Sequence, residues 1–159
     1  MKQVANQLID LLDSSLPFLR RISEAESLIV RGEGKWSRRE ILGHLIDSAA
    51  NNQQRFVRAQ LVDALAFPSY EQSRWVEIKG YRDRSWNELV ELWTASNRHL
   101  AHTIERIPES KLNTPCSIGE GNSVTLEFMV TDYLHHLKHH LGQILNPQRA
   151  AGRKHPPFG

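Results

Sequence analysis

Residues 125–146, TLEFMVTDYLHHLKHHLGQILN, decide the fold of this chain. Their apolar side chains recur every three or four positions, a spacing that predicts one amphipathic helix. Thr125 can cap the start of this helix with its hydroxyl, and Asn146 precedes a proline, so the helix is expected to end there. Four of the eight histidines of the chain lie within this stretch.

These four histidines form two pairs spaced four residues apart, His135 with His139 and His136 with His140. Either pair projects from one side of a helix and could bind one ion, as in the HExxH helix of zinc enzymes. Leu137 stands where that motif has its catalytic glutamate, which excludes the corresponding metalloprotease chemistry. The position of each histidine around the helix was compared with the centre of its apolar face, at about 100° per residue. His140 lies about 65° and His136 about 105° from that centre. His135 and His139 lie about 155° and 165° away, on the opposite side. The pair His136 and His140 is therefore expected to face the interior.

Three further amphipathic helices are predicted by the same periodicity. They span about residues 2–24, with a kink at Pro17, residues 38–61 and residues 85–107. The second and third of these open with Ser-x-x-Glu capping boxes at Ser37 and Ser85. Together with the last helix, and with no strand pattern, they predict an all-α four-helix bundle.

Two connections complete the predicted architecture, and the longer of them spans residues 63–84. It has no sustained helical period, but it carries several aromatic residues, which argue for an ordered segment. We interpret it as a crossover packed over one end of the bundle, whose rings either complete the core or contact a substrate. The second connection, residues 108–124, contains the single cysteine, Cys116, which has no CxxC partner and is interpreted as a structural thiol.

The bulk properties indicate a single domain over residues 1–150, followed by a flexible tail at 151–159. The chain has 20 Lys and Arg residues and 18 Asp and Glu residues, a net charge of +2. Because the basic residues are not clustered, the composition argues against nucleic-acid binding. No apolar run approaches the roughly 18 residues of a membrane span. The N-terminal MKQVANQLIDLLD is too polar for a signal peptide, so a cytoplasmic protein is expected.

A polar line of residues on the predicted helix 38–61 borders its apolar face: His44, Ser48, Asn51 and Arg55. His44 could complete a site of three imidazoles, the kind of site that leaves an ion with open positions. Periodicity permits this role for His44 without choosing it. On the last helix, Asp132 and Gln143 lie on the flank of the inward histidines, where either could hold an imidazole N–H.

The stretches KWSRREILGHLIDSAANNQQRF (35–56) and TLEFMVTDYLHHLKHHLGQI (125–144) together resemble the DinB-like, or DinB/YfiT-like, family of metal-dependent bundles. The resemblance extends over the whole helical part of the chain. It implies an up-down-down-up four-helix bundle with a long crossover between the second and third helices. It also implies a divalent metal ion, usually nickel or zinc, bound by His44, His136 and His140.

The wider family includes transferases that use the low-molecular-weight thiols bacillithiol, mycothiol or glutathione. The resemblance thus implies a metal-dependent enzyme acting on a small molecule, either a thiol S-transferase or a hydrolase that uses metal-activated water. Four polar residues are expected to hold the ligand histidines in place or to contact the substrate: Asp47, Asn51, Arg55 and Asp132. The alternative is a non-catalytic metal-binding or stress-response protein that acts through a partner or as a homodimeric scaffold.

Overall fold

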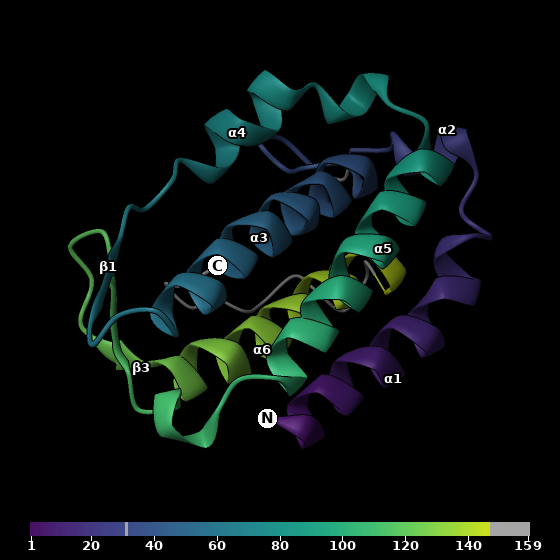
Figure 1. The fold of residues 1–159 in the computed structure, drawn as a ribbon. Coiled ribbons are helices and arrows are strands. Elements are labelled where there is room, and N and C mark those ends of the chain that lie inside the picture. The colour runs from purple at the N-terminus through teal and green to yellow at the C-terminus, as the bar shows by residue number, and fades with distance from the viewer. Residues whose placement is uncertain (31, 147–159) are drawn as a thin grey trace.

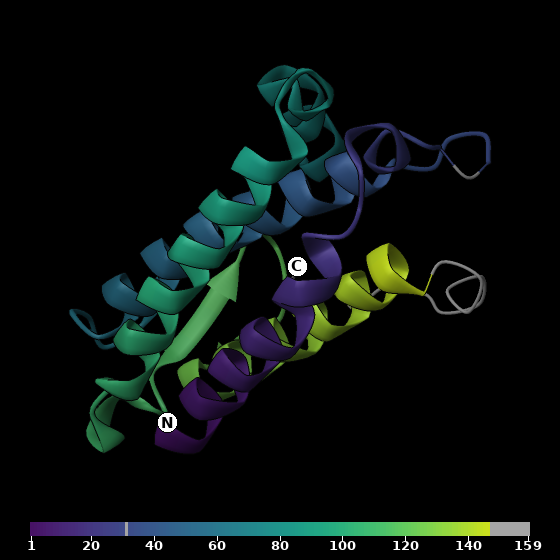
Figure 2. The same cartoon turned by 90° about the vertical axis from the view of Figure 1, so that its right-hand side faces the viewer.

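The computed structural model describes residues 1–30 and 32–146. Four long helices form the bundle: α1 (Lys2–Leu19), α3 (Arg38–Ala59), α5 (Trp86–Glu105) and α6 (Leu126–Leu145). Figures 1 and 2 show that α1 and α6 run in one direction, and α3 and α5 in the opposite direction. The prediction of an all-α, up-down-down-up bundle with a crossover between its second and third long helices is confirmed. The predicted tail, 151–159, lies outside the described residues.

Side-chain caps define the starts of α3 and α6, the two helices that carry the candidate ligands. At α3, the Ser37 hydroxyl accepts a hydrogen bond from the Glu40 amide, and the Glu40 carboxylate accepts one from the Ser37 amide, which completes the predicted capping box. At α6, the Thr125 hydroxyl accepts a hydrogen bond from the Phe128 amide. Each cap satisfies amides that the first turn leaves without intrahelical partners, and so fixes the helix register.

The start of α5 and the end of α1 differ from the predictions. Ser85 accepts a hydrogen bond from the Glu88 amide, but the Glu88 carboxylate pairs with Arg84 instead of closing a second capping box. α1 retains its internal Pro17 and ends at Leu19, and a separate short helix, α2 (Glu24–Ser27), follows with a capping box of its own. The predicted helix therefore ends at Leu19, five residues earlier than expected, and α2 begins only at Glu24.

The crossover contains a helix that the sequence did not predict. Its elements are β1 (Leu65–Phe67), α4 (Gln72–Lys79) and the 3-10 turn η1 (Tyr81–Asp83). Because α3 and α5 run in the same direction, the chain must return along the length of the bundle, and Figure 1 shows α4 lying alongside α3. The crossover therefore covers a side of α3 and not only one end of the bundle. Only Val76 of α4 is buried, too few residues to give a recognisable period.

A small sheet also departs from the expectation of no strands. β1 pairs in parallel with β2 (Pro115–Ile118), with Leu65 opposite Cys116, and β2 pairs antiparallel with β3 (Val124–Thr125). Between α5 and this sheet lies the short turn η2 (Glu109–Lys111). The strands have two to four residues each, and their pairing joins segments that are distant in the sequence. They are therefore too short to show the alternation of apolar and polar residues that predicts a strand. Cys116 is fully buried in β2, and its burial raises the pKa of the thiol.

The hydrophobic core lies between the four long helices. Leu12 of α1, Leu45 of α3, Trp93 of α5 and Leu137 of α6 have no exposed surface. Burying side chains of this size contributes on the order of 1.5–3 kcal/mol each, so the core holds α3 and α6 in a fixed relation. Within residues 1–30 and 32–146, no helix is long and apolar enough to cross a membrane.

Candidate metal centre

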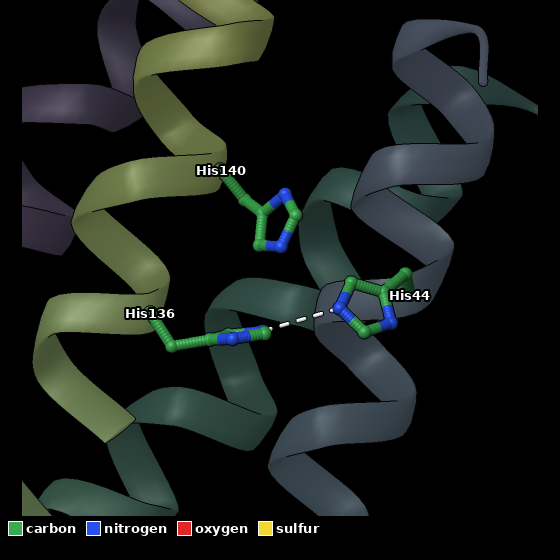
Figure 3. A group of neighbouring side chains, drawn as sticks. All are labelled: His44, His136 and His140. Carbon is green, nitrogen blue, oxygen red and sulfur yellow. Dashed lines mark hydrogen bonds between the residues drawn. The ribbon is translucent and has the colours of Figure 1, made fainter. Parts of the chain in front are cut away.

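Three histidines from two neighbouring helices converge inside the bundle. His44 extends from α3, and His136 and His140 extend from α6, and the three rings point toward one another in Figure 3. Their exposed fractions are 0, 1 and 4%. One ligand nitrogen from each lies within 4.8 Å of the others. The structure therefore brings together the three histidines that the resemblance selected.

The donor set and its spacing fit a single metal ion. The Nε2 atoms of His44 and His136 are 3.1 Å apart. Two imidazole nitrogens about 2.0–2.1 Å from one octahedral or tetrahedral ion lie about 2.8–3.4 Å apart. The three rings contact one another, with centroids separated by 4.6 to 5.1 Å. Three neutral donors suit a borderline ion such as zinc or nickel, and would leave at least one coordination position open.

Gln143 fixes the orientation of one of these rings. The Nδ1–H of His140 donates to Oε1 of Gln143 across 2.7 Å, and the Gln143 amide donates to Nε2 of His139 across 3.0 Å. His140 therefore presents its Nε2 lone pair as the atom available to an ion. His135 is exposed, as the helix phase predicted. His139 was expected on the same outer face, but it is half-buried because it lies against Gln143.

We expect Gln143→Leu to weaken zinc binding about 10-fold, because partners that hold a ligand imidazole by its second nitrogen contribute about 10- to 100-fold to metal affinity. The apolar replacement removes the hydrogen bond that fixes the tautomer and orientation of the His140 ring. Titration of the metal-free protein against a chromophoric chelator measures the change. Gln143→Glu, which retains an acceptor, should recover most of the affinity. Equal affinities for the leucine variant and the wild type would contradict the orienting role.

Two aromatic residues outside the predicted site pack against His44 and its neighbour Gly43. The ring of Trp36, immediately before the α3 cap, lies 5.2 Å from the His44 ring. On the crossover side, the Tyr81 ring packs against Gly43, where an added Cβ would lie 2.2 Å from Tyr81 Cδ2. The sequence singled out neither contact, because each depends on how a separate segment folds back against α3.

Asp47 lies on α3 one turn after His44, and its side chain bonds two residues of the crossover. It has no exposed surface, and its Oδ1 accepts hydrogen bonds from Lys79 Nζ at 2.6 Å and from the Tyr81 hydroxyl at 2.7 Å. Burial, together with this hydrogen bond, raises the pKa of Tyr81 and keeps the phenol protonated as a donor. Asp47 was a predicted candidate, whereas Lys79 and Tyr81 were not.

We expect Gly43→Ala to lower the free energy of unfolding by about 1–3 kcal/mol, since overpacking of this kind forces side chains or backbone to shift. The Tyr81 ring would have to move, and with it the hydroxyl that donates to Asp47. Urea denaturation followed by circular dichroism measures the loss. Gly142→Ala on α6 is the matched control, because an added Cβ there meets nothing within 4 Å. It should stabilise the protein by about 0.5–1 kcal/mol through helix propensity, and destabilisation by both substitutions would contradict the packing argument.

The other predicted candidates lie outside the group of three histidines. Asn51 is buried, and its side-chain amide donates to the backbone oxygen of Asp47 at 2.9 Å. Arg55 is 1% exposed and lies farther along the same line of α3. Asp132 is half-buried on α6, four residues before His136. Asp47, Asn51 and Arg55 thus form a buried polar strip that leads away from the histidines.

Comparisons with known proteins agree with this architecture. The chain is 22% identical over 123 residues to a protein of Halalkalibacterium halodurans named as a candidate metal-dependent hydrolase, an alignment that covers 77% of this chain and 71% of that protein. Its fold is similar to that of YfiT from Bacillus subtilis, described as a probable metal-dependent hydrolase with an unusual four-helix bundle topology. The TM-score is 0.78 at 19% identity, over 91% of this chain and 86% of YfiT. The family model of the DinB superfamily matches residues 7–144. The chain belongs to the DinB superfamily.

Proposed function

We propose that this protein is a metal-dependent enzyme in which His44, His136 and His140 bind one divalent ion, zinc or nickel. The observation that carries the proposal is the convergence of three buried imidazoles with ligand nitrogens within 4.8 Å of one another. An ion bound by the three inward nitrogens would compensate for the cost of burying these polar rings in the bundle. The relatives named as metal-dependent hydrolases support the same assignment.

The reaction class that we propose is hydrolysis of a small-molecule substrate. A divalent ion held by three neutral imidazoles, with a position left open, would lower the pKa of a water or thiol that binds it. The protein's own part is to orient His140 through Gln143 and to place the Trp36 ring beside His44. Asp47, held by Lys79 and Tyr81, provides a carboxylate one helical turn from His44.

Thiol S-transfer is the second candidate activity, with a low-molecular-weight thiol as cosubstrate. Among the described residues, the ligand group contains three histidines and no carboxylate, which favours this activity. Neutral ligands do not reduce the positive charge of the ion, so that charge would be available to stabilise a thiolate. Hydrolysis and S-transfer would use the same ligands and differ in the nucleophile that occupies the open position.

Turnover assays of the metal-loaded protein distinguish these activities. Activated esters and amides would be tested in buffer alone, and electrophiles such as a haloarene would be tested with and without a small thiol. We expect metal-dependent turnover in one arm and its loss in His44→Ala. Hydrolysis without thiol supports the first candidate, and thiol-dependent consumption of the electrophile supports the second. Full metal occupancy with no turnover in either arm would instead favour a non-catalytic metal-binding protein.

A further inference from the structure

Two buried arginines on α3 have very different surroundings. Arg39 is 5% exposed and donates six hydrogen bonds, which go to Glu24, Ser27 and the backbone oxygens of Arg82 and Arg84. Its guanidinium group also forms an ion pair with the Glu24 carboxylate. Arg39 is therefore satisfied by the protein itself, and it joins α2, α3 and the end of the crossover.

Arg55 is buried more completely but has far fewer partners. It is 1% exposed, and among the described residues its guanidinium makes one long hydrogen bond, 3.4 Å to Asn52 Oδ1, and no ion pair. Its Nε is buried without a hydrogen-bond partner in that part of the chain. The guanidinium group also lies over the Phe67 ring of β1, with 5.7 Å between the guanidinium carbon and the ring centroid.

This arrangement is unfavourable unless something else meets the guanidinium. Arginine stays protonated in proteins, and a buried charge without a counter-charge costs several kcal/mol. Burial lowers the pKa of Arg55, which is the direction expected of a cation that lacks an anionic partner. The single long hydrogen bond and the Phe67 ring, 5.7 Å away, do not offset that cost.

Tyr70 presents a second buried donor, close enough to Arg55 for the two groups to influence each other's pKa. Its hydroxyl is buried and has no hydrogen-bond partner within residues 1–30 and 32–146. Burial and the nearby Asp47 together raise the pKa of Tyr70 to about 12, against an opposing effect of Arg55. The phenol therefore keeps its proton, and it lies near both Asp47 and Arg55. Tyr70 and Phe67 are only half-buried, so this end of the strip reaches the surface.

We propose that Arg55 and Tyr70 form an anion-binding subsite for a carboxylate or phosphate group of the substrate. A guanidinium fork with a neighbouring hydroxyl is a donor set that recognises either oxyanion. Arg55 lies three helical turns beyond His44, which places the subsite on the order of 10–15 Å from the histidines. Its use in catalysis rests on the proposed function, and the substrate class it specifies is a small molecule with its anionic group at that distance from the reacting group.

Anion binding would be measured on metal-free protein, which separates this proposal from that of the metal centre. The probes are inorganic phosphate, acetate and the neutral acetamide, and the signal is the Nε–H resonance that disappears in Arg55→Met. We expect a saturable shift of this resonance with phosphate, acetate or both, and none with acetamide. The relative affinities for the two anions identify the preferred group. Tyr70→Phe should raise the Kd at least about threefold.

Stability measurements provide a second arm with a matched control. Without added anion, Arg55→Met should be at least as resistant to urea as the wild type, because a methionine in place of an unpaired buried cation removes its desolvation cost. Arg39→Met should unfold at clearly lower urea, since it loses six hydrogen bonds. Phosphate or acetate should raise the urea midpoint of the wild type and not that of Arg55→Met. Equal destabilisation by the two substitutions, or no shift of the Nε–H resonance with either anion, would overturn the proposal.

Discussion

His136→Ala is expected to lower the affinity of the metal-free chain for zinc or nickel by at least about 100-fold, since loss of a direct ligand should exceed the effect of losing an orienting partner. The substitution removes the nitrogen that lies 3.1 Å from the Nε2 of His44 and reduces the donor set to two. Because His136 is 1% exposed, no solvent-facing group can readily replace it. Competition with a chromophoric chelator, on protein prepared without a metal-affinity column, measures the change.

His135→Ala provides the matched control for this prediction. It removes the same side chain from the adjacent position of α6, where the histidine is exposed and lies outside the group of three. Its affinity should stay within about twofold of the wild type, because a solvated imidazole lies outside the ligand group. If the two substitutions weakened metal binding equally, or if neither did, the assignment of the inward pair would be wrong.

Asp47→Ala is expected to lower the free energy of unfolding by about 2–4 kcal/mol, because removing one partner of a buried polar network leaves the others unsatisfied. The carboxylate is fully buried and accepts hydrogen bonds from Lys79 and Tyr81. The Lys79 side chain is 43% exposed and can regain water, so the effect falls below that of breaking a wholly buried ion pair. Urea denaturation followed by circular dichroism measures the loss.

Tyr81→Phe separates the two hydrogen bonds that Asp47 accepts. It removes only the phenolic donor and keeps the ring against Gly43, so its cost should be about 1 kcal/mol. Asp132→Ala tests a half-buried carboxylate on the other helix of the site and should cost less than Asp47→Ala. If Asp47→Ala were no more destabilising than Tyr81→Phe, Asp47 would not be the anchor of the crossover on α3.

The long helices and the orientation of the histidines could be predicted because both depend on local periodicity. The spacing of the apolar residues of α6 was enough to place His136 and His140 inside the bundle and His135 on the surface. The choice of His44 as their companion came from the family resemblance alone. A helical wheel shows which side of one helix faces the core, but it does not show which residue of another helix lies opposite.

The features that the sequence did not predict depend on contacts between distant segments. α4 buries only Val76, and the strands are too short to alternate visibly. The packing of Tyr81 on Gly43 and the bond from Lys79 to Asp47 form only once the crossover lies along α3. Arg55 appeared in the sequence as one member of a polar line, and its lack of counter-charge became visible only with its neighbours in place.

X-ray absorption spectroscopy, combined with metal analysis of protein saturated with zinc or nickel and then desalted, tests the central claim most directly. The predicted result is close to one ion per chain, with a shell of three imidazole nitrogens at about 2.0–2.1 Å for zinc. His44→Ala should lose one of these imidazoles or the ion itself. Retention of no metal, or an unchanged shell in His44→Ala, would contradict the assignment of His44, His136 and His140 as the ligands.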